Sequence, residues 1–114
     1  MNRYGTMSQE LLRKAREALT EGDLVQASEK GWGAAAQAVK AVAEARGWPH
    51  DSHRALYEIA NRLAAEAGDP DLRRLFSVAS SLHQNFYEHW MPNEMVAADL
   101  ESVAELLERF EALP

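Results

Sequence analysis

The residues that could do chemistry at neutral pH are concentrated in one short stretch, residues 82–90. It contains two of the four histidines, His83 and His89, and histidine is the side chain whose ordinary pKa lies nearest to neutrality. An amide pair, a phenol and a carboxylate lie between these two histidines: Gln84, Asn85, Tyr87 and Glu88. Side chains of these types form hydrogen bonds with bases or peptides and stack on them, so the stretch is a candidate recognition surface.

A second interpretation of the same stretch is structural. Residues four apart share a helix face, which places 84 with 88 and 85 with 89 and turns Phe86 and Trp90 toward the core. The polar side chains would then form the solvated face of an amphipathic helix. His83 would be a core histidine hydrogen-bonded to a neighbouring helix. The residues alone leave both interpretations open.

The histidines do not predict a metal site. His50 and His53 lie three apart near a helix start, and His83 and Tyr87 lie four apart on one face. Neither pair belongs to a His-Glu-x-x-His or paired Glu-x-x-His pattern that would supply three or four ligands. The chain has no cysteine, which excludes a thiolate metal site, a thiol nucleophile and a disulfide framework. We therefore expect no metal and no cofactor.

Length and composition predict one globular domain over residues 1–114. Apolar residues make up 46% of the chain and charged residues 26%, which is the usual balance of a folded protein. The first residues lack the apolar stretch of a signal peptide, and polar side chains interrupt the most apolar segment, residues 31–45. We therefore expect a cytoplasmic protein that does not associate with membranes.

The net charge of -6 is distributed unevenly. Residues 93–114 contain six acids and one base, Arg109, and so carry -5, whereas residues 1–92 carry only -1. Most of the chain is thus nearly neutral, which leaves weak binding to nucleic acid compatible with the charge. The acidic last segment could mimic phosphate or dock a basic protein, or it could be the solvated side of an amphipathic helix.

Apolar residues recur at spacings of three and four throughout the chain, which predicts an all-α fold. We expect five helices. The first starts at Ser8 as N-cap, the second follows Asp23, the third starts at 51 or 52, the fourth has Pro70 in its first turn, and the fifth starts with Asn93 as a possible N-cap. Helix-ending residues predict where the first four stop: Gly22, Gly47, Gly68 and Pro92. Short connections between long helices favour an up-and-down bundle of four to five helices.

Three segments carry a family resemblance: residues 27–43, 48–56 and 82–88. The first is a long alanine-rich helix with Lys40 in its second half, and the second places a histidine and a leucine at the start of the next helix. Together they resemble the archaeal PaREP proteins, which look like a branch of the HEPN superfamily of helical nucleotide-binding domains. The resemblance covers about residues 8–112.

This resemblance implies a four- or five-helix bundle that is commonly a homodimer. Such proteins are often encoded beside a partner nucleotidyltransferase or act in toxin and defence systems, so RNA or a nucleotide is an implied ligand. Many members are metal-independent ribonucleases that use an arginine, then four to six residues, then a histidine, frequently with an asparagine directly after the arginine.

The ribonuclease motif is incomplete in this chain. If His89 is the motif histidine, Gln84 occupies the arginine position and Asn85 matches the asparagine. Arg46 and His53 also have the spacing, but they lie across a helix end and the following loop, so we interpret that match as a coincidence. RNA cleavage without a metal needs a cation beside the scissile phosphate, and a glutamine cannot neutralise phosphate charge.

We therefore predict a non-catalytic helical module for binding or regulation, in a nucleic-acid-linked or toxin–antitoxin system. Its binding residues would be those of the candidate surface: His83, Gln84, Asn85, Tyr87, Glu88 and His89. The alternative is a degenerate endoribonuclease in which His89 is the general acid or base and a second subunit supplies the arginine. A third possibility is an assembly or antitoxin-like partner that never contacts nucleic acid.

Overall fold

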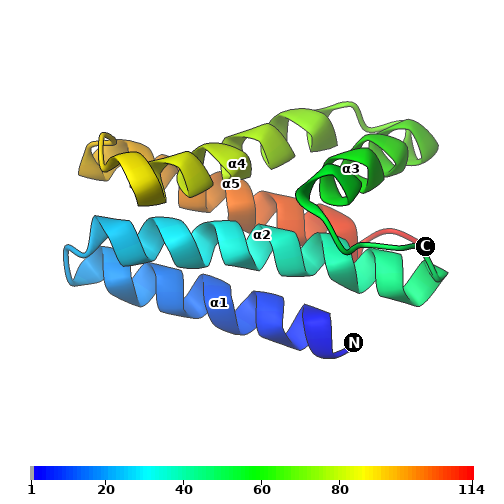
Figure 1. The fold of residues 1–114 in the computed structure, drawn as a ribbon, viewed down its shortest axis with the longest axis horizontal. Helices are drawn as coiled ribbons and strands as arrows, with labels where there is room; N and C mark the ends of the chain where they lie inside the picture. Colours follow the sequence, from blue (N-terminus) through cyan, green and yellow to red (C-terminus); the bar gives the residue numbers. More distant parts are fainter. Residues whose placement is uncertain (1) are drawn as a thin grey trace.

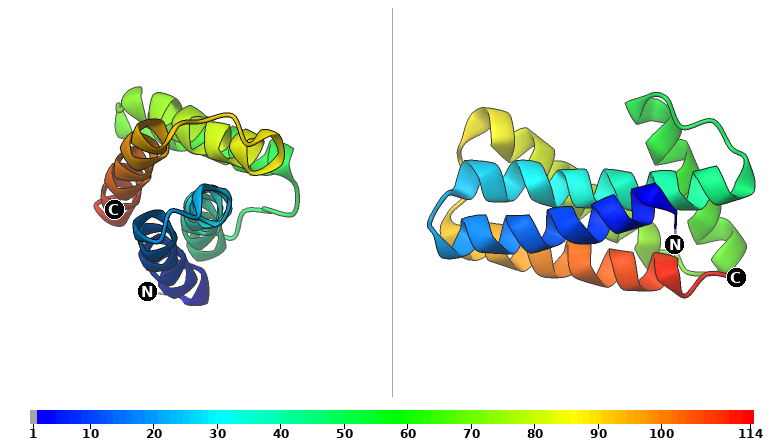
Figure 2. Two further views of the ribbon diagram at one scale, coloured as in Figure 1. Left: turned by 90° about the vertical axis from the view of Figure 1, so that its left-hand side faces the viewer. Right: turned by 90° about the horizontal axis from the view of Figure 1, so that it is seen from below.

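The computed structural model describes residues 2–114, which form five helices joined by short turns (Figure 1). They are α1 (Arg3–Thr20), α2 (Leu24–Arg46), α3 (His53–Ala67), α4 (Asp71–Glu88) and α5 (Asn93–Glu111). Helices α1, α2, α4 and α5 alternate in direction along the long axis, whereas α3 lies across one end of the bundle (Figure 2). The predicted all-α, up-and-down bundle is confirmed. Over residues 2–114, no helix combines the length and the hydropathy needed to cross a membrane.

Most helix ends follow from local sequence. The side chains of Asp23 and Ser52 accept backbone N–H groups in the first turns of α2 and α3, as predicted for N-caps. Gly47 and Gly68 end the same two helices with φ of 71° and 63°. This left-handed conformation carries a steric penalty for any residue with a Cβ, which is why glycine marks these positions in the sequence.

Helix α1 begins earlier than predicted. It starts at Arg3 with Asn2 as its N-cap, so the prediction that Ser8 caps this helix is wrong. Ser8 lies inside the helix and is buried, and its hydroxyl donates a hydrogen bond of 2.7 Å to the carbonyl oxygen of Ala34 on α2. The hydroxyl is satisfied by the neighbouring helix, so burying Ser8 leaves no unpaired polar group.

Helix α4 ends earlier than predicted, at Glu88 instead of at Pro92. His89 adopts a left-handed conformation with φ of 56°, which turns the chain out of the helix. The prediction that Trp90 belongs to the core is therefore wrong, because its side chain is 64% exposed. The prediction that Asn93 caps α5 is wrong, because Asn93 is the first residue of the helix, Pro92 holds the N-cap position and no side-chain cap bond forms. Pro70, predicted in the first turn of α4, likewise lies at the N-cap position.

The small residues of α2 allow close packing in the centre of the bundle. Gly31 shows this best, because a Cβ at this position would lie 2.5 Å from Leu100 Cδ2 and 3.0 Å from Leu82 Cδ1. Helices α4 and α5 thus approach the α2 backbone at a distance that any side chain would prevent. The largest fully buried side chains come from α3, α4 and α5: Phe76, Leu63, Leu72, Leu75, Leu82, Leu100 and Leu106.

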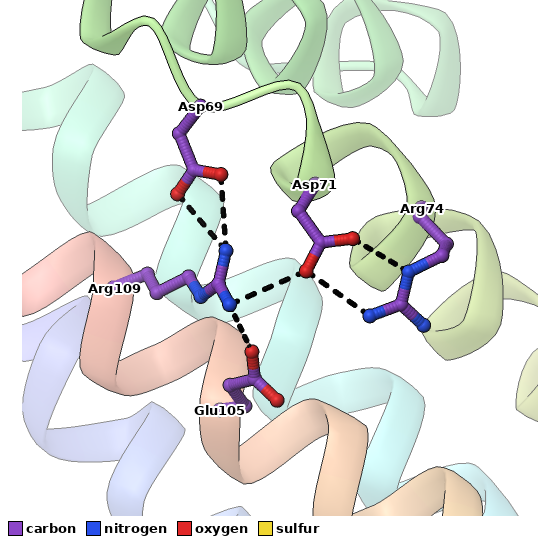
Figure 3. Close-up of polar contacts among 5 residues, drawn as sticks. All are labelled: Asp69, Asp71, Arg74, Glu105 and Arg109. Atoms are coloured by element: carbon purple, nitrogen blue, oxygen red, sulfur yellow. Dashed lines mark hydrogen bonds and ion pairs between the residues drawn. The ribbon is translucent and has the colours of Figure 1, made fainter.

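An arginine near the end of α5 ties this helix to the turn between α3 and α4 (Figure 3). Arg109 Nη1 donates to both carboxylate oxygens of Asp69, at 3.0 and 3.1 Å. Its Nη2 lies 3.3 Å from Asp71 Oδ2 and also contacts Glu105 one turn earlier. Asp71 in turn accepts a hydrogen bond of 2.6 Å from Arg74 Nε. This cluster, which we call the Arg109 clasp, helps to fix the end of the bundle where α3 lies.

Candidate binding surface on helix α4

The apolar stripe of α4 decides which of its side chains can reach a ligand. The buried residues recur every three or four positions and pack toward the core: Leu72, Leu75, Phe76, Ala79 and Leu82. The stripe leaves Gln84, Tyr87 and Glu88 exposed and His83 half-buried at the boundary. The surface predicted from the sequence is therefore partly present, on the second half of α4.

Asn85 is the predicted binding residue that does not reach the surface. Its side chain is 1% exposed, and its Nδ2 donates a hydrogen bond of 2.8 Å to Ser28 Oγ on α2. Its Oδ1 accepts the backbone N–H groups of Trp90 and Met91, at 2.9 and 2.8 Å. The amide is thus fully used inside the chain, where it links two helices and orders the turn after α4.

His83 instead belongs to a row of rings from α3 and α4 that lies over a ring of α2. Its imidazole centroid lies 5.3 Å from that of His53 on α3 and 5.3 Å from that of Tyr87, and both contacts are edge-to-face. Behind these rings lies the buried indole of Trp32 on α2, 5.3 Å from His83 and 5.9 Å from His53. We call His53, His83 and Tyr87 the ring row. Neighbouring rings at 4.5–7 Å stabilise one another, which holds the row in place.

The ring row combines an exposed part with a half-buried part. The Tyr87 side chain is 67% exposed and His53 is also exposed, whereas His83 is half-buried between them. Burial lowers the pKa of His83 below its ordinary value, and the neighbouring His53 lowers it further. His83 is therefore a neutral imidazole at pH 7, able to donate and accept hydrogen bonds but carrying no charge with which to hold a phosphate.

The remaining predicted residues are exposed but isolated. Within residues 2–114, the side chains of Gln84, Glu88 and His89 form no hydrogen bond and no ion pair. The His89 backbone N–H donates to the Asn85 carbonyl oxygen at 2.9 Å, which closes α4. His89 is thus free to contact a ligand, but Gln84 provides no cation beside it.

The second pair with ribonuclease-like spacing separates in the fold. Arg46 donates a hydrogen bond of 2.7 Å to Glu66 Oε2 and one of 3.3 Å to the carbonyl oxygen of Pro114. Its guanidinium also lies over the ring of Trp48. His53 belongs to the ring row. The two residues therefore have different partners, in agreement with the interpretation of their spacing as a coincidence.

A groove of about 850 Å³ lies elsewhere in the molecule, between α1, α2 and the end of α5. Small or apolar residues form most of its wall, including Gly5, Ala38, Ala41 and Phe110. Among residues 2–114, no three His, Asp or Glu side chains are arranged to hold a metal ion, either here or at the ring row. Most side chains that line the groove have no polar group with which to bind a ligand, so the ring row is the stronger candidate site.

Sequence reasoning identified part of this site and missed the rest. It found His83 and Tyr87 because they share one helix face, but it placed His53 only near a helix start and did not single out Trp32 within the alanine-rich segment 27–43. Trp32 and His53 enter the site because α2 and the first turn of α3 meet the second half of α4. No spacing within the sequence predicts that these helices come together at this point. The one available signal is Trp32 itself, a large aromatic residue within an alanine-rich helix.

The fold and the ring row define a small all-α bundle with a candidate binding surface. A model of the archaeal PaREP1/PaREP8 family matches residues 3–107, and the chain belongs to this family. The resemblance to archaeal PaREP proteins is thereby confirmed, whereas the placement within the HEPN superfamily stays a prediction. No curated protein matches the chain.

A solved structure supports the fold. The crystal structure of a protein from Sulfolobus solfataricus superimposes with a TM-score of 0.82 and covers 92% of this chain and 93% of its own. The two sequences are 24% identical, so the match bears on the arrangement of the helices and not on function.

Proposed function

We propose that this PaREP-family protein is a non-catalytic binding module of a nucleic-acid-linked or toxin–antitoxin system, and that its ring row holds an unpaired base of RNA or a nucleotide. The observation that carries the proposal is the contact of His83 with both His53 and Tyr87, each at 5.3 Å, over the buried Trp32. An exposed phenol beside a neutral imidazole offers a stacking face and hydrogen-bonding groups for a flat ring.

The neighbouring side chains fit the same role. Gln84 and His89 are exposed and have no partner within residues 2–114, so they can form hydrogen bonds with the edge of a base. Glu88 would accept a hydrogen bond from an exocyclic amine. Asn85 supports the surface from inside without touching the ligand.

The assembly belongs to the same proposal. The resemblance to HEPN proteins implies a homodimer and a nucleotidyltransferase-like protein as partner, and we propose that the protein acts in the cytoplasm. A base-binding surface would let such a module recognise the RNA or nucleotide on which its partner acts. The net charge of -6 opposes tight binding to a phosphate backbone, so we expect stacking to contribute most of the affinity.

Binding of short RNA tests the proposal. Fluorescence anisotropy of a labelled single-stranded 8-mer at low salt should show saturable binding that Tyr87→Ala and His83→Ala weaken by about 5- to 150-fold, because stacking contributes about 1–3 kcal/mol per base. His50→Ala is the matched control, since that imidazole pairs with Glu44 at 2.9 Å and contacts Tyr4 on α1. Equal binding by all variants, or none by the wild type, would contradict the proposal.

A cleavage assay separates binding from the alternative function, a degenerate endoribonuclease. Mixed RNA incubated with the protein in chelator should remain intact, because Gln84 cannot supply the positive charge that metal-free cleavage requires. Cleavage by the wild type that disappears in His89→Ala would instead establish the ribonuclease, with an arginine supplied by a second subunit.

A further inference from the structure

The end of the bundle formed by the α4–α5 turn exposes apolar side chains that the core does not use. Tyr87, Trp90 and Met95 are 67%, 64% and 52% exposed. Tyr87 lies on the last turn of α4, Trp90 on the connecting turn and Met95 on the first turn of α5. We call Trp90 and Met95, with Tyr87 at the margin, the end patch. Large apolar side chains gathered on a surface in this way are typical of interaction sites.

The backbone that carries Trp90 is ordered by the core. The N–H groups of Trp90 and Met91 both donate to Asn85 Oδ1, and Asn85 is itself fixed by Ser28. A tryptophan on a fixed backbone loses little backbone freedom when it binds, and its side chain has only two rotatable bonds to order. Such rigid aromatic anchors are the residues that contribute most to protein interfaces.

The charge around the end patch is predominantly negative. The α1–α2 turn and the α4–α5 turn lie at the same end of the bundle (Figures 1 and 2). Residues 18–29 and 84–100, which form this end, contain no lysine or arginine and contain six acids: Glu21, Asp23, Glu29, Glu88, Glu94 and Asp99. None of the six forms an ion pair within residues 2–114. One cation lies near them, Lys30, whose ammonium donates to Gln26 Oε1 at 2.7 Å, so the protein offsets only part of their charge.

We propose that the end patch docks a basic, lysine- or arginine-rich segment of another protein. The negative field attracts such a segment, and Trp90 provides both an apolar contact and a cation–π face for its side chains. A second copy of this chain is a poor occupant because two identical acidic ends repel each other. A phosphate backbone is repelled from this end for the same reason, whereas the neighbouring ring row is proposed to hold only a base, by stacking.

Synthetic peptides test this docking surface directly. The probe is a fluorescein-labelled dodecapeptide in which lysine and arginine alternate with leucine, and its control carries glutamate at every basic position. Anisotropy should show binding of the basic peptide alone, weakened about 10-fold or more by Trp90→Ala, as is typical of an interface anchor. Glu88→Gln with Glu94→Gln should also weaken binding, and added salt should do the same.

The matched control is Met7→Ala. Met7 is 52% exposed, like Met95, but lies on α1 away from the end patch. This variant should bind the basic peptide as the wild type does. Equal binding of the basic and acidic peptides, unchanged binding by Trp90→Ala, or equal losses in Trp90→Ala and Met7→Ala would each overturn the proposal.

The tryptophans provide an independent readout of where the peptide binds. The chain has three, and only Trp90 lies at the end patch: Trp32 is buried, and Trp48 lies against Arg46 and Arg62. In a ¹H–¹⁵N correlation spectrum the indole signal of Trp90 should shift during the titration while the other two stay in place. Movement of the Trp48 signal with a stationary Trp90 signal would overturn the proposal. So would dimerisation in sedimentation experiments that Trp90→Ala abolishes.

Discussion

The side-chain amide of Asn85 donates a hydrogen bond of 2.8 Å to the hydroxyl of Ser28, and this pair connects α4 to α2 inside the core. The Ser28 hydroxyl donates in turn to the carbonyl oxygen of Leu24, at 2.7 Å. On its other side Asn85 accepts the two N–H groups of the turn that follows α4. One buried side chain therefore fixes both the packing of two helices and the backbone on which Trp90 is exposed.

Replacing Asn85 should destabilise the protein strongly. In Asn85→Ala, Ser28 loses its donor and the N–H groups of Trp90 and Met91 lose their acceptor, so we expect a loss of about 2–4 kcal/mol in the free energy of unfolding. Urea denaturation measures it. The control is Gln84→Ala, an exposed neighbour that should change stability by no more than ~0.5 kcal/mol. Similar losses in both variants would contradict the structural role of Asn85.

Two glycines of α2 should respond oppositely to the same substitution. In Gly31→Ala the new Cβ would lie 2.5 Å from Leu100 Cδ2, so the core must shift, and we expect a loss of about 1–3 kcal/mol. In Gly33→Ala the nearest atom is Leu11 Cδ1 at 3.2 Å, and Leu11 is only half-buried and can move, whereas Leu100 is fully buried. Because alanine favours the helix by up to ~1 kcal/mol, this variant should be neutral or more stable. Thermal unfolding of both variants measures the difference.

The sequence predicted the helices well because their signals are local. The spacing of apolar residues and the positions of Asp23, Ser52, Gly47 and Gly68 depend on nearby contacts alone. The two wrong boundaries, at Ser8 and after Glu88, depend on partners in other helices. Ser8 bonds to Ala34, whereas the α4 end is set by a buried amide. A sequence pattern carries no information about such distant partners.

The candidate site was harder to predict than the fold for the same reason. The face shared by His83 and Tyr87 follows from helix geometry, and the structure places both rings together. The contribution of His53 depends on the angle at which α3 crosses α4, and that angle is set by the packing of whole helices. The sequence likewise did not predict that the Asn85 side chain points into the core, because the 3.6-residue period places it close to the boundary between the buried and exposed faces of α4.

The Arg109 clasp should contribute more to stability than the ion pairs on α1. Arg109 connects α5 to the α3–α4 turn, whereas Arg13 pairs only with Glu10 and Glu17 of its own helix. Arg109→Ala should therefore lower the unfolding midpoint more than Arg13→Ala does, and 1 M salt should reduce the difference. Arg109→Lys should restore only part of the stability, because lysine lacks the planar fork. Equal midpoints for both alanine variants would show that the clasp does not stabilise the fold.

The same cluster makes stability sensitive to acid. Hydrogen bonds from Arg74, with the nearby charges of Arg74 and Arg109, hold the pKa of Asp71 below its ordinary 3.8. A carboxylate with a lowered pKa stabilises the fold above pH 3.8, and this stabilisation is lost as pH falls through the folded-state pKa. Asp71→Asn should therefore be less stable than the wild type at pH 7, and the gap should narrow toward pH 3. A gap that stays constant over this range would contradict the role of the charge.

Replacing Asp99 should have the opposite effect on stability to replacing Asp71. Burial raises the pKa of this carboxyl above its ordinary 3.8, although Ser81 Oγ donates to it at 3.0 Å. A raised pKa means that ionisation opposes folding, so the cost is absent below pH 3.8 and grows as pH rises through the folded-state pKa. Asp99→Asn keeps an acceptor for Ser81 and should be more stable than the wild type at pH 7 but not at pH 3.5. The control, Glu101→Gln, removes an exposed carboxylate and should bring no gain.

His83 should make the protein less stable as pH falls below neutrality. Burial and the nearby His53 lower the pKa of His83 below its ordinary 6.5, so between these two values the unfolded chain binds more protons than the folded one. The free energy of unfolding should therefore decrease as pH falls below about 6.5 and stop decreasing below the folded-state pKa. His83→Phe keeps a ring against Trp32 and cannot be protonated, so its urea midpoint should vary less between pH 7.5 and 5. A variant whose midpoint follows that of the wild type over this range would show that protonation of His83 is not the cause.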